Sequence, residues 1–195
     1  MGNLVRCYWK PPKKWWRCEY QVTLVNGRRY CKGDTPCEYQ DITDPNCWCA
    51  QRTKDFEGLV LRAYQDSLGN WTIGIGHKIT KNDTFLFNES KTINLIEADK
   101  IFAEDWAKAV KGAKSLSYWL EMHHLVKCVI IDMHFQMGHR GYKSFKKMET
   151  ALKQRNYIEA AKELMDSRYA KQTPERAKEN YELMMEAAKE EEQDD

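Results

Sequence analysis

The pattern of hydrophobic and polar positions along the chain changes its period near residue 77. From residue 71 to residue 76, apolar side chains alternate with polar residues or glycines, and this period of two predicts a strand with one apolar face. Gly69 and Asn70 come just before it and predict a tight turn. The segment between Glu57 and His77 should therefore form a glycine-rich hairpin, with Thr72 pointing away from the core.

From residue 95 onward, apolar residues recur every three or four positions, which predicts amphipathic helices. Residues 125–131 are apolar nearly all round and predict a buried central helix, in which Cys128 is expected to be ordinary core. Residues 160–165 predict another helix, and the proline of 172–174 suits the start of a further one. A connecting helix is predicted by the stripe Leu95, Ala98, Phe102 and Trp106. These patterns indicate an α+β fold.

The composition of the chain changes near residue 50. The first 18 residues carry five Lys or Arg and no acid, interleaved with tryptophans, and residues 20–30 predict a hairpin around an Asn-Gly turn. We interpret residues 1–52 as a small cysteine-rich, β-rich module, residues 53–185 as the main domain, and residues 186–195 as a solvated acidic tail. Six of the seven cysteines lie in the module: Cys7, Cys18, Cys31, Cys37, Cys47 and Cys49.

The state of these six cysteines is open at the level of sequence. Disulfides are favoured because a module of about fifty residues buries too little apolar surface to hold itself together, and fifteen pairings are possible. A zinc site is a weaker alternative, since no C-x2-C knuckle or paired histidine lies near Cys47 and Cys49. The third alternative is that the six cysteines remain reduced thiols. The module's tryptophans suit binding to sugars, docking to another protein, or the module's own core.

Length and charge set outer limits on function. The chain has 195 residues with 42% hydrophobic content, enough for one ordinary core or for a small and a larger domain. A net charge of +2 gives no reason to expect nucleic-acid binding. We expect no membrane span, because no run of about eighteen apolar residues occurs, and no signal peptide at the start of the sequence.

Candidate chemistry gathers around the hairpin. Glu57 lies beside Phe56 and Leu59, and such apolar surroundings raise the pKa of a carboxyl group and favour its protonated form. Asp66 lies beside a glycine turn and should be solvated and ionised. Hydrolysis of a glycosidic bond without a metal usually needs such a pair, one carboxyl to donate a proton and one carboxylate opposite it. Surface carboxylates are common, so the pair alone is a weak signal.

The spacing of these residues is more specific than their types. The pattern E-x8-D-x5-T, followed by I-G-I-G-H, resembles the catalytic segment of the phage-type lysozymes, the T-even-phage muramidase family (glycoside hydrolase family 24). Residues 135–138 and 167–177 resemble two further stretches of that family, in the same order. The resemblance covers about residues 53–185 and implies the family's two-lobed fold.

The resemblance also implies catalytic roles. Glu57 would be the general acid, and Asp66 with Thr72 would position or activate the attacking water, so that the anomeric centre is inverted. Gln136 would face the substrate, and Gly74 would let a polymer approach the backbone. No cofactor and no catalytic metal are expected.

Two supporting pairs follow from the same resemblance. Arg176 would face Glu57 across the cleft, and His77 would pair with Asp105 between the hairpin and the connecting helix. We interpret the histidine as structural, because its partner is a packing aspartate and not a substrate group.

The expected function is hydrolysis of bacterial peptidoglycan at the β-1,4 bond between N-acetylmuramic acid and N-acetylglucosamine, for cell lysis. Such an enzyme would reach the wall from the host cytoplasm through a holin-made hole. The alternative is a virion or tail protein in which the domain is structural or penetrates the wall locally. In either case residues 1–52 would attach the protein to the wall or to the virion.

Overall fold

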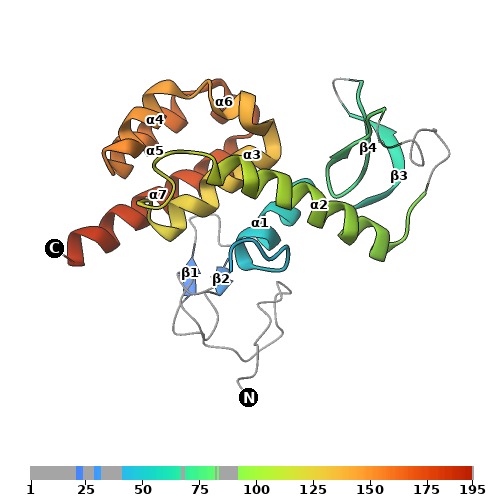
Figure 1. Ribbon diagram of the computed structural model, residues 1–195, viewed down its shortest axis with the longest axis horizontal. Coiled ribbons are helices and arrows are strands. Elements are labelled where there is room, and N and C mark those ends of the chain that lie inside the picture. The colour runs from blue at the N-terminus through green and yellow to red at the C-terminus, as the bar shows by residue number, and fades with distance from the viewer. Residues whose placement is uncertain are drawn as a thin grey trace, which may run out of the picture.

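The computed structural model describes residues 21–23, 29–31, 41–66, 69–81, 83 and 92–194. A small β-sheet lobe and a larger helical lobe lie at opposite ends of the long helix α2 (Figure 1). The arrangement confirms an α+β architecture for the main domain. Its helices are α1 (Trp48–Glu57), α2 (Leu95–Lys114), α3 (His124–Tyr142), α4 (Lys146–Lys153), α5 (Tyr157–Met165), α6 (Arg168–Gln172) and α7 (Pro174–Asp194).

The small lobe is an antiparallel sheet in the order β3 (Val60–Gln65), β4 (Trp71–Gly74) and β5 (His77–Lys78). Tyr64 pairs with Thr72 across the first two strands. Ile73 is fully buried, together with Ala63 and residues from the start of α2, whereas Thr72 lies outside this apolar cluster. The predicted strand forms, but the predicted alternation of burial does not: Thr72 and Gly74 are buried like Ile73, because the other face of β4 is also covered, and Ile75 packs with the core of the helical lobe.

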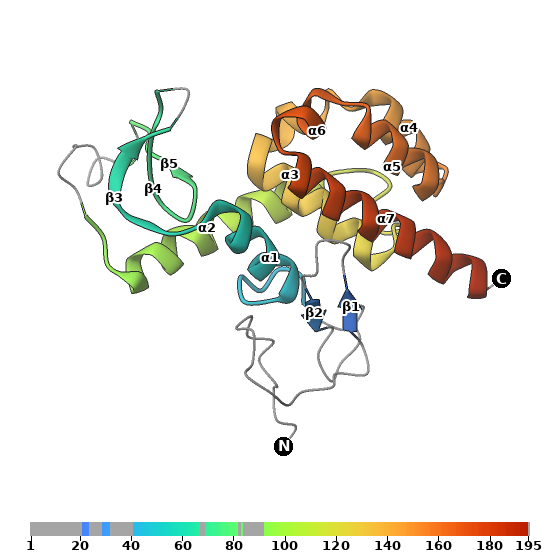
Figure 2. The same ribbon diagram turned by 180° about the vertical axis from the view of Figure 1, so that it is seen from behind.

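Helix α2 joins the two lobes, as Figures 1 and 2 show from opposite sides. Asn94 and Glu97 form a capping box that starts the helix by satisfying its first backbone N–H groups. Ala98, Phe102 and Trp106 are buried as predicted. Leu95 is 59% exposed, so its assignment to the buried stripe was wrong. The periodicity gives the face of a helix but not how far along that face the packing partners extend.

Helix α3 is the core of the helical lobe. Its residues from Leu125 to Ile131 are buried except for Lys127, which confirms the predicted central helix. Gly138 interrupts the helical backbone of α3 with φ 69° and ψ 171°. Helices α5 and α7 form at the predicted positions, and Pro174 is the first residue of α7. Met165, the last apolar residue of the stretch 160–165 that predicted α5, is the last residue of the helix and is 40% exposed.

The first helix crosses the predicted module boundary at residue 52. Cys47 caps the start of α1 through a contact from the Ala50 backbone N–H to its Sγ, and residues 47–50 are buried in the core of the helical lobe. Cys49 forms a disulfide with Cys128 of α3, with a Cα–Cα separation of 5.5 Å. Cys128 is thus not ordinary core, and Cys49 is not crosslinked within the module or available to zinc.

The acidic end of the chain is also not a separate, frayed tail. Helix α7 continues to Asp194, and Ala187 and Ala188 are buried against the helical lobe. Glu191 forms an ion pair with Arg155 at 2.7 Å. The apolar side chains on one face of α7 keep this face packed while the acidic residues lie on the outer faces.

Two short strands are described before residue 41. β1 (Gln21–Thr23) and β2 (Arg29–Cys31) pair in antiparallel fashion with Val22 opposite Tyr30, in line with the predicted hairpin. Its predicted Asn-Gly turn and the cysteines at positions 7, 18 and 37 lie outside the described residues. Within the described part of the chain, no helix is both long and apolar enough to cross a lipid bilayer.

Candidate active site

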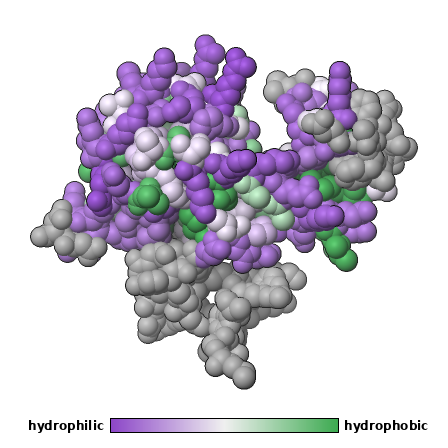
Figure 3. Space-filling model, viewed as in Figure 1, coloured by the Kyte–Doolittle hydropathy of each residue, from purple (hydrophilic) through white to green (hydrophobic). Residues whose placement is uncertain are grey.

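An open cleft of about 770 Å³ lies between the two lobes. Figure 3 shows the hollow between the larger helical mass and the smaller lobe. The hairpin supplies one wall, and α2 with the second half of α3 supplies the floor and the opposite wall. The residues that line it include Glu57, Tyr64, Asp66, Thr72, Gly76, His77, Asp105, His134, Phe135, Gln136, Met137 and His139.

Glu57 reaches this cleft because it is the last residue of α1. Gly58 follows with φ 69°, a backbone conformation that ends the helix and is natural only for glycine. The Glu57 side chain is 20% exposed, and its Oε1 accepts a hydrogen bond from Arg176 Nη1 at 2.6 Å. A Cβ atom at Gly76 would lie 2.5 Å from Glu57 Oε2. The loop after β4 therefore needs glycine there to leave room for the carboxyl group.

Arg176 is fixed from behind by Asp132 of α3. Its Nε and Nη2 donate to the two oxygens of this carboxylate at 3.0 and 2.8 Å, a bidentate pair. Burial alone would lower the pKa of Arg176, but the charge of Asp132 and then of Glu57 raises it overall. The guanidinium thus stays charged and points its remaining Nη1 at Glu57.

Asp132 has further buried partners that the sequence analysis missed. Arg52 lies 3.4 Å away, the Thr53 hydroxyl donates at 2.7 Å, and the Asn180 amide donates at 3.1 Å. Burial alone would raise the pKa of Asp132, but Arg176 and Arg52 hold it well below its usual range. One signal was visible in the sequence: an aspartate inside the apolar run of α3 must meet a buried cation.

Asp66 and Thr72 lie in the wall opposite α3, on the hairpin. The Asp66 carboxylate accepts hydrogen bonds from the Asn70 backbone N–H at 2.8 Å and from its side-chain amide at 2.9 Å. Gly69 makes the turn between them with φ 77°. Thr72 Oγ1 donates to the Asn70 carbonyl at 3.3 Å. The hairpin turn therefore fixes both side chains, and both line the same cleft as Glu57.

His77 and Asp105 join the hairpin to α2. His77 Nδ1 lies 2.6 Å from Asp105 Oδ2, and Lys108 donates to the other oxygen of Asp105 at 2.8 Å. The hydrogen bond to Asp105 raises the pKa of His77, although burial opposes the shift. The pair lies at the edge of the cleft and connects the two elements that carry its walls.

The two predicted substrate contacts differ in position. Gln136 lines the cleft, whereas Gly74 is not among its lining residues. A Cβ atom at Gly74 would point at Ile93 and Ala98, at 3.3 and 3.7 Å, which places this glycine against the core of the small lobe. The glycine beside the cleft is Gly76, two residues later.

His134 and His139 also line the cleft and were not singled out in the sequence. Burial lowers the pKa of His134 to about 4, so its ring is neutral near neutral pH. Its Nδ1 lies 2.8 Å from the Ile130 carbonyl and must donate, which leaves Nε2 as an acceptor 3.3 Å from His139 Nδ1. Sequence offered no signal here, because histidines within an apolar helix are usually packing residues.

These features define a class of protein: a two-lobed α+β domain with two carboxyl groups in one open cleft. One of them, Glu57, is hydrogen-bonded to an arginine, and the other, Asp66, accepts hydrogen bonds from the Asn70 backbone and side-chain amides. The family model for phage lysozyme matches residues 54–181. The chain belongs to the phage lysozyme family, which makes it an enzyme of the lysozyme type.

Similar proteins come from two kinds of source. The chain is 32% identical over 142 residues to "Probable T4-type lysozyme 2" and, separately, to "Probable T4-type lysozyme 1" of Dictyostelium discoideum, covering 62% of this chain and 84% of each relative. It is also 32% identical over 154 residues to the "Pre-baseplate central spike protein Gp5" of Enterobacteria phage T4, covering 69% of this chain but 27% of that protein.

Proposed function

We propose that the protein hydrolyses peptidoglycan at the β-1,4 bond between N-acetylmuramic acid and N-acetylglucosamine, with inversion of the anomeric centre. The observation that carries the proposal is the placement of Glu57 and Asp66 in one cleft with unlike partners. Two carboxyl groups with different tasks are what hydrolysis of a glycosidic bond requires.

Glu57 acts as the general acid in this proposal and protonates the leaving-group oxygen. Arg176 holds its Oε1, and the absence of a side chain at Gly76 leaves room for its Oε2. The position of the reactive group is therefore fixed by contacts from α7 and from the loop after β4. Such fixed geometry lowers the cost of orienting the acid toward the bond.

Asp66 and Thr72 hold the attacking water. Thr72 uses its one hydroxyl proton on the Asn70 carbonyl, which leaves its oxygen lone pairs to accept a hydrogen bond from water. The Asp66 carboxylate, oriented by its hydrogen bonds from Asn70, takes a proton from the same water as it attacks. The substrate would also meet Gln136 and the backbone at Gly76.

The first test compares the full chain with Glu57→Gln and with a control, Glu121→Gln, which removes a charge from an exposed position outside the cleft. Release of reducing ends from purified peptidoglycan should fall by at least about 100-fold in Glu57→Gln, because general-acid catalysis contributes about 10²–10⁴-fold. The control should cut at the normal rate. Normal cutting by Glu57→Gln, with its fold intact by circular dichroism, would remove this residue from the acid role.

The same digest tests the bond and the stereochemistry. Borohydride reduction of the products should convert muramic acid, and not glucosamine, to its alditol. Proton NMR during the first minutes should show the α-anomer as the initial product of the β-linked substrate. Glucosaminitol would refute the proposed bond, and an initial β-anomer would refute inversion.

The similarity to a phage spike protein supports a second biological role. In that role the enzyme is a virion or tail component that cuts the wall locally during infection, with residues 1–52 as its attachment segment. In the first role it accumulates in the host cytoplasm, reaches the wall through a holin-made hole, and uses residues 1–52 to bind the wall. Mass spectrometry of purified particles separates the two, because a lysis enzyme should be absent from them.

A further inference from the structure

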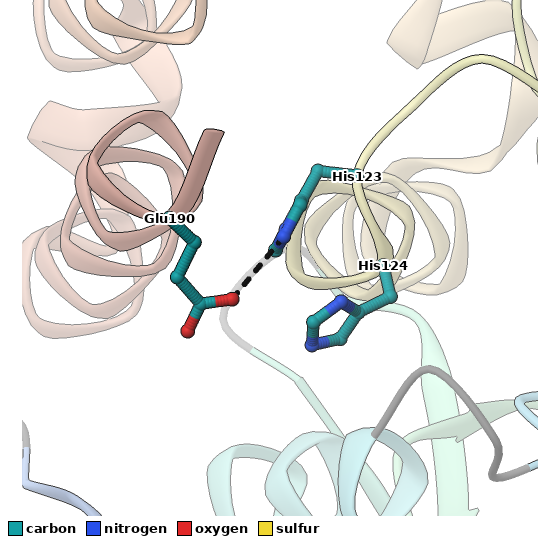
Figure 4. Close-up of side chains that lie close together, drawn as sticks. All are labelled: His123, His124 and Glu190. Carbon is teal, nitrogen blue, oxygen red and sulfur yellow. Dashed lines mark ion pairs between the residues drawn. The ribbon is translucent and has the colours of Figure 1, made fainter. Parts of the chain in front are cut away.

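A second cluster of chemically active side chains lies outside the cleft, where α3 begins and α7 ends. His123 and His124 are consecutive residues at the start of α3, and Glu190 projects toward them from the last turns of α7 (Figure 4). One ligand atom from each residue can be chosen so that all three lie within 4.8 Å of one another. Two imidazoles and a carboxylate form a donor set that divalent transition metals, zinc above all, bind in proteins.

The distances within the cluster are close to those of a metal site. Metal–ligand distances of about 2.0–2.2 Å and tetrahedral angles separate the ligand atoms by about 3.3–3.5 Å. His123 Nε2 lies 3.2 Å from Glu190 Oε2, so this pair already has the required spacing. The rings of His123 and His124 lie with centroids 4.3 Å apart. The ligand atoms of the full set lie within 4.8 Å of one another, so the side chains must move closer together to complete it.

The backbone of His123 is held in place by the neighbouring helix α5. Its N–H donates to the hydroxyl of Tyr157 at 2.8 Å, and Tyr157 is buried. A metal on Nε2 places the ring proton on Nδ1, which gives up the contact from the Leu125 N–H. That contact is long, at 3.4 Å, so little is lost. His123 is therefore already held near the position of a ligand, and moving its ring proton from Nε2 to Nδ1 costs little.

The surrounding charge favours a cation. Residues 186–194 of α7 contain five acids and one lysine, and the C-terminal end of a helix carries partial negative charge. The His123 side chain is 15% exposed and Glu190 is 30% exposed. An ion can thus reach the cluster and keep a water as its fourth ligand.

We propose that His123, His124 and Glu190 form a binding site for a divalent transition-metal ion, Zn²⁺ in the first instance, which fastens the start of α3 to the end of α7. The role is structural. The metal replaces a histidine–carboxylate ion pair with three bonds, and it ties the last turns of α7 to the central helix of the helical lobe.

The test uses the full chain, three variants and two readouts. Isothermal titration with Zn²⁺ should give one site whose affinity falls by at least about 10- to 100-fold in His124→Gln and in Glu190→Gln, since even residues that only support metal ligands contribute that much. Glu192→Gln is the matched control, because it removes the same charge from an exposed position at the same end of α7. Zn²⁺ should also raise the melting temperature of the wild type and of Glu192→Gln, but not of the other two variants.

Cobalt(II) separates this site from the cysteines near the N-terminus. Nitrogen and oxygen ligands give only weak visible bands, whereas thiolates add an intense charge-transfer band in the near ultraviolet. Weak bands that disappear in His124→Gln would support the proposal. Thiolate bands alone, binding that is equal in all variants, or no binding by the folded wild type would each overturn it.

Discussion

Asp132 offers the sharpest test of how the cleft is held together. It is a fully buried carboxylate that meets two buried arginines, so Asp132→Asn takes the ion-pair partner from Arg52 and leaves Arg176 with Glu57 alone. Breaking a buried ion pair by removing one member costs about 3–5 kcal/mol. For a chain of this size each kcal/mol lowers the melting temperature by about 2–4 °C, so we expect a drop of roughly 6–20 °C.

The exposed pair of Asp99 with Lys54, at 2.9 Å, supplies the control. The Asp99 side chain is 64% exposed, and Asp99→Asn should cost less than about 1 kcal/mol because solvent screens the pair. Both variants are melted by circular dichroism at pH 7, and their unfolding in urea gives the free energy directly. An Asp132→Asn variant that melts within a degree or two of Asp99→Asn would refute the buried network.

The pH dependence of the same variant has a definite sign. The pKa of Asp132 is lowered in the folded state, so its contribution to stability is fully present above its unfolded value of about 3.9 and is lost as the pH falls toward the folded pKa. The gap in melting temperature between wild type and Asp132→Asn should therefore be constant from pH 7 to about 5 and shrink below about 4. A gap that widens on acidification would contradict the assigned charge of Asp132.

Two further predictions concern the acid and the disulfide. In the peptidoglycan assay, Gly76→Ala should lower activity by up to about 100-fold while the protein stays folded, because the new Cβ pushes Glu57 Oε2 by about 1 Å. Gly69→Ala is the control and should keep most of the activity, because Gly69 has a similar φ but open space around it. Reduction of the Cys49–Cys128 bond, which closes a loop of 79 residues, should destabilise the fold by about 4–5 kcal/mol in urea titrations. A Cys128→Ala variant should already lack this part of the response to reductant, and an equal response would refute the assignment.

Most of the fold was predictable because its elements are locally periodic. The alternation in residues 71–76 predicts a strand, and the all-round apolar run in α3 predicts a buried helix, and both elements form. The alternation does not predict burial on both faces of β4, because that depends on which elements cover it. Periodicity does not state where the packing partner ends, which is why Leu95 and Met165, at the two ends of apolar patterns, are exposed. Cys128 was misjudged for a related reason: its partner lies 79 residues away, and nothing local distinguishes a bridged cysteine from a packed one.

The hairpin side of the candidate site could be predicted from the sequence more fully than the side formed by the helical lobe. The spacing of Glu57, Asp66 and Thr72 reflects one hairpin, so a short stretch of sequence contains their arrangement. Arg176 lies 119 residues from Glu57, and only the resemblance to a family paired them. Asp132 could have been found from chemistry alone, since a charge in an apolar helix requires a buried partner, but sequence could not name that partner.

The module boundary predicted at residue 52 falls within helix α1, and this position bears on catalysis. Helix α1 carries Glu57 at its last position, and its first turn is crosslinked to α3 through Cys49. In the middle of α1, Arg52 and Thr53 both contact Asp132, which also belongs to α3. The residues assigned by composition to the appended module therefore anchor the helix that holds the general acid. A chain shortened to begin at residue 53 would lose two of these anchors, whereas one that begins at residue 41 keeps them all.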